Sequence, residues 1–189
     1  MFKQLKLPSL LQEVSFGPWE KFGVRVWVKR DDLIHPSISG NKWRKLYGHL
    51  LKYQQNSFKG VLTFGGAYSN HIIATAAACH YLDIPVYGVI RGEVYEENPA
   101  MKYAKEMGMM LIPLPREAYR RKDITSLIER YPEIDFERLM VVPEGGGGEE
   151  GVLGCKEILD EITVDYHYIV SAVGTGTTLA GLSRYANDE

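Results

Sequence analysis

Four short polar or glycine-rich segments have residue types that could bind or transform a ligand. They span residues 39–42, 65–71, 144–148 and 174–178. Each lies where an apolar stretch typical of a strand gives way to a helical pattern. Ligands of open α/β sheets bind beyond the carboxyl ends of the strands, where such junctions lie. These segments therefore contain the candidate site.

The last of these segments has the composition of a phosphate cradle. It consists of Gly174, Thr175, Gly176, Thr177 and Thr178 at the start of a predicted helix. Free N–H groups and the helix dipole favour an anion at such a start, and glycine lets the ligand approach the backbone. The alternative is a tight turn with threonine caps. Neither the dinucleotide fingerprint nor the GxxxxGK[ST] phosphate loop is present.

Lys42 lies near the start of a predicted helix, where a positive charge is unfavourable. That position lowers the pKa of an amine and suits a nucleophilic, Schiff-base-forming lysine. The alternative is a solvated surface lysine. We expect Lys45, Lys52 and Lys59 to be of that solvated kind.

Ser69, Asn70 and His71 begin another predicted helix after a Gly-Gly turn. A hydroxyl and backbone N–H groups at this place could bind a substrate carboxylate. Ser and Asn are also good helix caps, so a structural role is the alternative. His71 could be an acid or base, or equally a hydrogen-bonded structural histidine.

Other reactive residue types favour structural roles. Arg30, Asp31 and Asp32 predict an ion-paired loop rather than a metal site, and we expect no metal. Cys79 and Cys155 have no ligand or disulfide spacing, so we expect two buried, reduced thiols.

The elements that must position these segments follow a regular order. Short apolar stretches alternate with stretches of helical periodicity, which predicts an α/β fold, a parallel sheet with helices on both faces. The predicted strands span residues 24–29, 60–64, 85–90, 109–113, 139–142 and 166–172. The predicted helices span residues 41–53, 70–82, 98–107, 123–130, 149–161 and 177–186.

Composition narrows the class of function. The chain has 189 residues, 45% of them hydrophobic, and a formal net charge of -2. Such a balance gives no electrostatic argument for nucleic acid or an anionic membrane as a partner, and we expect neither. Residues 1–8 contain no apolar stretch of the length of a signal peptide, so a cytoplasmic protein is the default expectation.

Taken together, the segments resemble the D-cysteine desulfhydrase / 1-aminocyclopropane-1-carboxylate deaminase family of fold-type II enzymes, which use pyridoxal 5′-phosphate (PLP). The resemblance rests on four blocks in the family's order: Lys29-Arg30-Asp31-Asp32-Leu33 with Ser39-Gly40-Asn41-Lys42-x-Arg44-Lys45-Leu46, Phe64-Gly65-Gly66-Ala67-Tyr68-Ser69-Asn70-His71, Pro143-Glu144-Gly145-Gly146, and Gly174-Thr175-Gly176-Thr177-Thr178. One departure is Gly147-Gly148, where the family usually has Ser-Asn.

The resemblance implies a role for each block. Lys42 and Ser69 would be catalytic, and Lys42 would bind PLP covalently and move the Cα proton. Asn70 would contact the ring oxygen of the cofactor, and residues 174–178 would hold its phosphate. Ser69, Asn70 and His71 would receive the carboxylate of the substrate.

The resemblance also implies a domain organisation. Residues 46–152 would form a complete smaller domain, with 1–45 and 153–189 belonging to a larger PLP domain. Family members are much longer, so the chain is expected to be truncated at its C-terminus, and they are commonly homodimers. The expected reaction degrades a small amino acid to ammonia and a 2-oxo acid. The alternatives are a catalytically incomplete domain that binds only a ligand or partner, and an unrelated phosphate or nucleotide binder.

Overall fold

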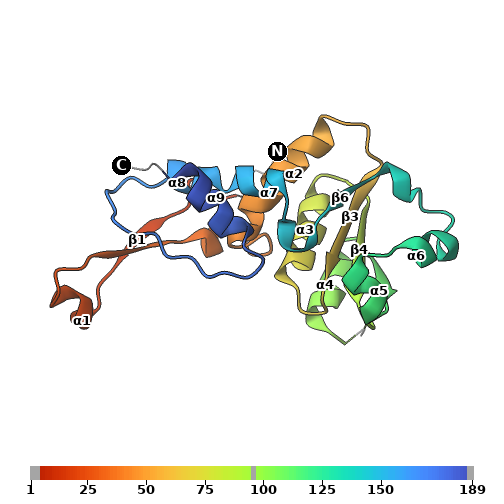
Figure 1. Cartoon of the computed structure of the whole chain (residues 1–189), viewed down its shortest axis with the longest axis horizontal. Coiled ribbons are helices and arrows are strands. Elements are labelled where there is room, and N and C mark those ends of the chain that lie inside the picture. Colours follow the sequence, from red (N-terminus) through yellow and green to blue (C-terminus); the bar gives the residue numbers. More distant parts are fainter. Residues whose placement is uncertain (1–4, 95–96, 187–189) are drawn as a thin grey trace.

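The computed structural model describes residues 5–94 and 97–186. Figure 1 shows two parts side by side, one holding a parallel sheet and the other a β-hairpin with the last two helices. The helices α2 (Asn41–Gln54) and α7 (Glu149–Gly154) lie where the two parts meet. The predicted ligand segments in residues 39–42 and 144–148 adjoin these two helices.

The parallel sheet has the strand order β5-β4-β3-β6, with every neighbouring pair parallel. Its central strand β3 is buried at every position, as expected for a strand covered on both faces. Four strands were predicted here and four are found. They are β3 (Gly60–Gly65), β4 (Val86–Arg91), β5 (Met110–Leu114) and β6 (Leu139–Val142).

Helices cover both faces of the sheet, as predicted. Successive residues of a strand point to opposite faces, so Val61 packs in one hydrophobic core and Leu62 in another. The Val61 core includes residues of α2, α3 (Asn70–Tyr81) and α4 (Pro99–Glu106). The Leu62 core includes residues of α5 (Arg116–Arg121) and α6 (Thr125–Arg130).

The helices begin at residues that satisfy their free N–H groups. Ser69 caps α3, and its hydroxyl accepts a hydrogen bond from the N–H of Ile72. Asn98 caps α4 by accepting hydrogen bonds from the N–H groups of Ala100 and Met101. These caps fix the direction in which α3 and α4 leave the carboxyl edge of the sheet.

The second part contains an antiparallel hairpin, β1 (Leu11–Val14) and β2 (Val26–Lys29), joined through the short helix α1 (Gly17–Glu20). The strand predicted over 24–29 is present, but its expected place in the parallel sheet is wrong. It pairs with β1, which was not predicted, because β1 is short and polar at its two central positions.

The strand predicted over 166–172 is not found, and this is the clearest error of the sequence analysis. The backbone from 162 to 176 has no regular secondary structure, and Val170 is 95% exposed. A strand needs a neighbour for its N–H and C=O groups. Within the described residues no strand lies beside this segment. Its backbone N–H and C=O groups therefore have no strand with which to form a hydrogen-bonded ladder.

One helix was not predicted, and two predicted helices differ in their extent from the structure. A helix, α5, precedes the expected 123–130 helix, which itself starts at Thr125. The helix predicted over 149–161 is divided into α7 and α8 (Lys156–Asp160), with Cys155 between them. The last helix, α9 (Thr177–Tyr185), matches its prediction closely.

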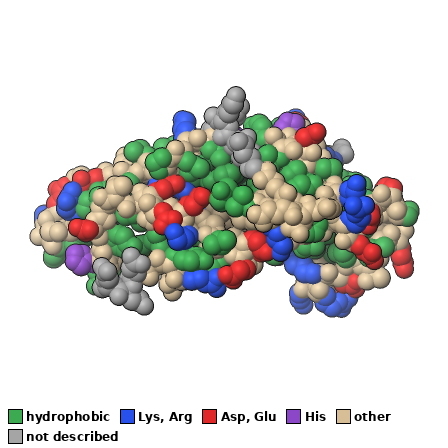
Figure 2. Space-filling view, turned by 90° about the horizontal axis from the view of Figure 1, so that it is seen from above, with side chains coloured by type: hydrophobic (Ala, Val, Ile, Leu, Met, Phe, Trp, Pro, Cys, Tyr) green, Lys and Arg blue, Asp and Glu red, His purple; other side chains and the backbone are tan. Residues whose placement is uncertain are grey.

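The surface carries hydrophobic side chains in both parts, and Figure 2 shows a group of Lys and Arg side chains on the part that holds the sheet. No helix within the described ranges is long and apolar enough to cross a membrane. Cys79 and Cys155 are buried and free, as predicted.

Candidate functional site

One cavity of about 280 Å³ brings the four predicted segments together. Its walls come from the start of α2, the start of α3, the turn after β6 and the turn before α9. Every residue predicted to bind a ligand lines it: Lys42, Ser69, Asn70, His71, Gly174, Thr175, Gly176, Thr177 and Thr178. The others are Asn41, Lys45, Glu144, Gly145, Ala172, Val173 and Leu179.

Lys42 is half-buried in this cavity and tied to a neighbour. Its Nζ donates a hydrogen bond of 2.9 Å to Oδ1 of Asn41, and Nδ2 of Asn41 donates one of 2.9 Å to Oγ1 of Thr178. Burial lowers the pKa of Lys42 below its usual value. The amine is thus directed by Asn41 toward the 174–178 turn, with more of its neutral, nucleophilic form than a solvated lysine has.

Lys45 is buried at 3% exposure, so its predicted surface position is wrong. It lies one helical turn after Lys42, which places both side chains on one face of α2. Burial and the neighbouring Lys42 amine lower the pKa of Lys45 to about 8. Lys45 makes no ion pair within the part of the chain that the structure describes. A buried cation in this state is stabilised by an anion placed in the cavity.

His71 is neutral, and its hydrogen bonds identify the tautomer. The Thr63 hydroxyl donates its only proton to the Val142 carbonyl at 2.9 Å, so it accepts from Nε2–H of His71 at 2.8 Å. Burial, followed by the Lys42 and Lys45 charges, lowers the pKa of His71 to about 3. Its buried Nδ1 has no hydrogen-bond partner among the described residues. Of the two predicted alternatives, these observations favour the hydrogen-bonded structural histidine over an acid or base.

Ser69 and Asn70 line the cavity at the start of α3, and Ser69 also caps that helix. The structural and ligand-binding alternatives therefore apply to the same hydroxyl. Ser69 is half-buried and Asn70 exposed, so both can reach a small molecule.

The 174–178 turn has the geometry of an anion cradle. Gly176 takes φ 82°, in the left-handed region that glycine favours, and starts α9. Thr177 and Thr178 are buried. A Cβ built on Gly145 would lie 2.8 Å from Cγ2 of Thr175, so the turn after β6 packs against this cradle.

Close packing between α2 and α7 holds Lys42 and Lys45 in place. A Cβ on Gly48 of α2 would collide with the carbonyl group of Glu150, and one on Gly154 of α7 would collide with the carbonyl oxygen of Arg44. Glycine is therefore required at both positions for the two helix backbones to lie this close. His49 of α2 also forms a 2.9 Å hydrogen bond with the carbonyl oxygen of Gly147, which joins α2 to the tetraglycine turn before α7.

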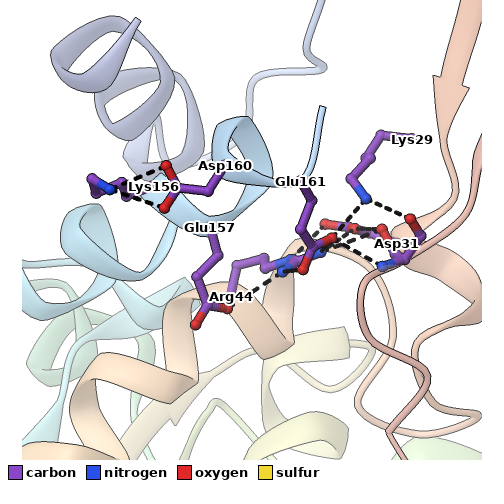
Figure 3. A network of polar contacts seen from close by, with 8 residues as sticks. Lys29, Asp31, Arg44, Lys156, Glu157, Asp160 and Glu161 are labelled. Carbon is purple, nitrogen blue, oxygen red and sulfur yellow. Dashed lines mark hydrogen bonds and ion pairs between the residues drawn. The ribbon is translucent and has the colours of Figure 1, made fainter. Parts of the chain in front are cut away.

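A buried ion network anchors α2 from the other side (Figure 3). Arg44 is fully buried and pairs with Asp31, Glu157 and Glu161 at 2.7–3.3 Å. Hydrogen bonds from Arg44 and Lys29 lower the pKa of Glu161 to about 2, although burial opposes the shift. The predicted ion-paired loop is confirmed, since Asp31 pairs with Arg44 and Asp32 with Arg30.

The cavity fits a small molecule that carries a phosphate and a reactive carbonyl. The Lys45 amine, two threonine hydroxyls and the free N–H groups of α9 suit the phosphate, and the Lys42 amine, whose pKa is lowered by burial, suits the carbonyl. Nδ1 of His71, which has no partner among the described residues, can accept a hydrogen bond from a ligand. Fold and cavity together define the class of PLP-binding α/β proteins.

The family comparison makes the assignment. The family described as "Pyridoxal-phosphate dependent enzyme" matches residues 9–189, and this chain belongs to it. PLP is therefore the cofactor of its family.

Relatives with known names agree with the predicted branch. The chain is 30% identical to the bifunctional D-cysteine desulfhydrase/1-aminocyclopropane-1-carboxylate deaminase of Arabidopsis thaliana over 85% of its length. It is 28% identical to the D-cysteine desulfhydrase of Klebsiella pneumoniae over 87% of its length. It covers 45% and 53% of these two proteins. The chain thus spans about half the length of the curated relatives it matches.

A solved structure, titled as that of the ACC deaminase homologue, superposes with a TM-score of 0.79 at 28% identity. The match covers 97% of this chain and 57% of the other. The fold-type II assignment is confirmed.

Sequence reasoning missed the role of two polar residues beside Lys42. Asn41 was seen only as part of a motif, and Lys45 was assigned to the surface. The signal for Lys45 was its spacing of three residues from Lys42, which puts it on the same helix face.

Proposed function

We propose that this chain binds PLP through Lys42 and serves the degradation of a small amino acid to ammonia and a 2-oxo acid. The observation that supports the proposal most directly is the half-buried amine of Lys42 and the buried amine of Lys45 in one cavity with the threonine turn. The names of the relatives favour D-cysteine or 1-aminocyclopropane-1-carboxylate as substrates.

In this proposal the chain's residues bind and orient the cofactor. Lys45, Thr177, Thr178 and the first N–H groups of α9 hold the phosphate, which offsets the cost of burying the Lys45 charge. Asn41 would orient the Lys42 amine for attachment of the cofactor through its 2.9 Å hydrogen bond. Bound PLP supplies an electron sink for the bonds of the substrate Cα.

The remaining residues act on the substrate. Ser69 and Asn70 receive its carboxylate at the start of α3, which orients the Cα toward Lys42. The Lys42 amine would take up and return a proton at Cα, for which a lowered pKa is favourable. His71 acts as a neutral acceptor and carries no proton to the substrate. With 1-aminocyclopropane-1-carboxylate there is no α-proton, so a ring bond must open instead.

The division of the chain into residues 1–45, 46–152 and 153–189, a homodimer and a cytoplasmic location stay predictions. The alternative function, a binding domain without a complete catalytic site, predicts cofactor binding without turnover.

The decisive experiment follows PLP attachment in the purified chain. We expect a visible absorption band that borohydride fixes onto the peptide containing Lys42, as measured by mass spectrometry. Lys42→Ala should remove both signals. Lys52→Ala, which changes an exposed lysine of the same helix, should keep both.

Release of ammonia from D-cysteine or 1-aminocyclopropane-1-carboxylate then separates the two functions. Turnover that depends on Lys42 supports the enzyme. Attachment without turnover supports the binding domain. A folded protein that shows no band would overturn the proposal.

A further inference from the structure

A second, larger cavity of about 1000 Å³ opens at the carboxyl edge of the sheet. The ends of β3, β4 and β5 and the turn after β6 contribute to it. Ser69 and Glu144 line both this cavity and the smaller one. The two spaces are therefore neighbours, and the larger one lies on the substrate side of the predicted site.

Arg91 and Arg116 both line this cavity at the carboxyl edge of the sheet. Nη2 of Arg91 lies 3.5 Å from where a Cβ of Gly66 would be, and Nε of Arg116 lies 3.7 Å from that of Gly92. Gly66 and Ser69 are the ends of one turn, closed by a 3.1 Å hydrogen bond from the Ser69 N–H. Such ends have Cα atoms within about 7 Å, so the Arg91 guanidinium lies one turn from Ser69.

Neither arginine has a partner of its own within the described residues. No hydrogen bond or ion pair joins Arg91 or Arg116 to another side chain there. The nearby carboxylate of Glu144 is already paired with Lys122 at 2.7 Å. An adjoining space of about 490 Å³ is lined by the same two arginines with Arg120 and Lys122. The two spaces together are lined by five cationic side chains, Arg130 among them, and by two carboxylates, Glu93 and Glu144. The edge therefore has cationic groups in excess.

We propose that Arg91 and Arg116 bind a second anionic group, carried by the side chain of the amino-acid substrate. The proposal rests on the proposed function, because it assumes that Ser69 and Asn70 hold the substrate carboxylate. The substrate class is then an amino acid with an acidic side chain: a carboxylate, sulfonate or phosphate. Neither D-cysteine nor 1-aminocyclopropane-1-carboxylate has such a group, so the substrate of this chain would differ from those for which its relatives are named. Guanidinium groups recognise all three through charge-assisted hydrogen bonds.

Position favours the substrate over a separate anion. Arg91 ends β4, which lies beside β3, the strand whose turn carries Ser69. Arg116 begins α5 just after β5, the next strand outward. A molecule held by its carboxylate at Ser69 can reach them without leaving the continuous opening. A separate regulatory anion could bind at a site apart from Ser69, whereas a substrate side chain requires an opening shared with Ser69.

The test compares aspartate with asparagine, which differ by one charge and have nearly the same shape. Dissociation constants of both enantiomers are measured by calorimetry on the PLP-loaded chain. We expect aspartate of one hand to bind at least about tenfold more tightly than asparagine, as a charge-assisted pair provides. Arg91→Gln and Arg116→Gln should each remove most of this preference and leave the asparagine affinity within about twofold.

Arg121→Gln is the matched control, because Arg121 lies on the same helix as Arg116, pairs with Glu117 and lines neither cavity. It should keep the preference. Equal affinities with the cofactor band intact would overturn this inference alone. A preference that survives in the Arg91→Gln, Arg116→Gln double variant would also overturn it. Absence of the cofactor band in the folded chain would instead overturn the proposed function. This inference would then be overturned as well, because it rests on that function.

Discussion

The part of the molecule that holds the parallel sheet and the part that holds the hairpin are stabilised by different interactions. The sheet is enclosed by two hydrophobic cores, and each inner strand has neighbours on both sides. The other part has a small apolar cluster of Cys155, Ile158 and Leu182 and an exposed segment over 162–176. It is joined to α2 by the Arg44 ion network.

The difference explains where the site lies. The strands and helices of the sheet set Ser69 and His71 by packing, which is rigid because cores are close-packed. The 174–178 turn belongs to the weakly packed part, and its position depends on contacts with Asn41 and Gly145. A ligand that bridges the two parts would therefore stabilise the second more than the first.

Hydrogen exchange should show the largest contrast. Amides of β3 should exchange only by global unfolding. The free energy of unfolding of a domain is about 5–15 kcal/mol, so this exchange should be slow. Amides of residues 167–173 should exchange almost freely, since no strand of the described part covers them. Equal protection of the two segments, measured by NMR or mass spectrometry, would show that 167–173 is paired in solution and would remove the contrast.

Breaking the ion network should have the next largest effect. Arg44→Met removes the cation of Asp31 and leaves Glu161 with Lys29 alone. Loss of one partner of a buried pair costs about 3–5 kcal/mol, and we expect the lower end here because both carboxylates are partly exposed. Urea unfolding followed by circular dichroism measures it. Arg25→Met is the control, because its pair with Glu13 is solvent-exposed and should change stability little. A small cost at Arg44 would mean that the second part is held by other contacts.

The smallest predicted effect concerns pH and Lys45. The pKa of Lys45 in the folded protein is about 8, against 10.5 for an ordinary lysine. Between these values the unfolded chain binds more protons than the folded one, so stability rises with pH. The gain is at most about 3 kcal/mol, because the neighbouring cavity admits water.

Unfolding free energies of the cofactor-free protein at pH 7.5 and pH 10 measure this gain, with Lys45→Met as the comparison. The substitution should flatten the rise, since methionine keeps the apolar stem and removes the charge. An unchanged slope in the variant would assign the rise to other groups. Added phosphate should also flatten it in the unsubstituted chain by pairing with Lys45.

Much of this protein is determined by the sequence itself. The β3 to β6 strands, the starts of α3 and α9 and the four ligand segments follow from apolar periodicity, caps and glycines, which act over a few residues. Because the carboxyl ends of parallel strands share one edge, the meeting of these segments could also be predicted. The cofactor class followed from the same residues.

Only the tertiary structure decided the rest, because those features depend on partners distant in the sequence. Lys45 resembles a surface lysine until α7 and the 144–148 turn cover it. The bridge from Asn41 to Thr178 spans residues far apart in the chain. The apolar 166–172 segment has the pattern of a strand, yet its hydrogen bonds require a neighbour that the described chain does not place beside it. Local pattern predicts what a segment can form, and long-range packing decides whether it does.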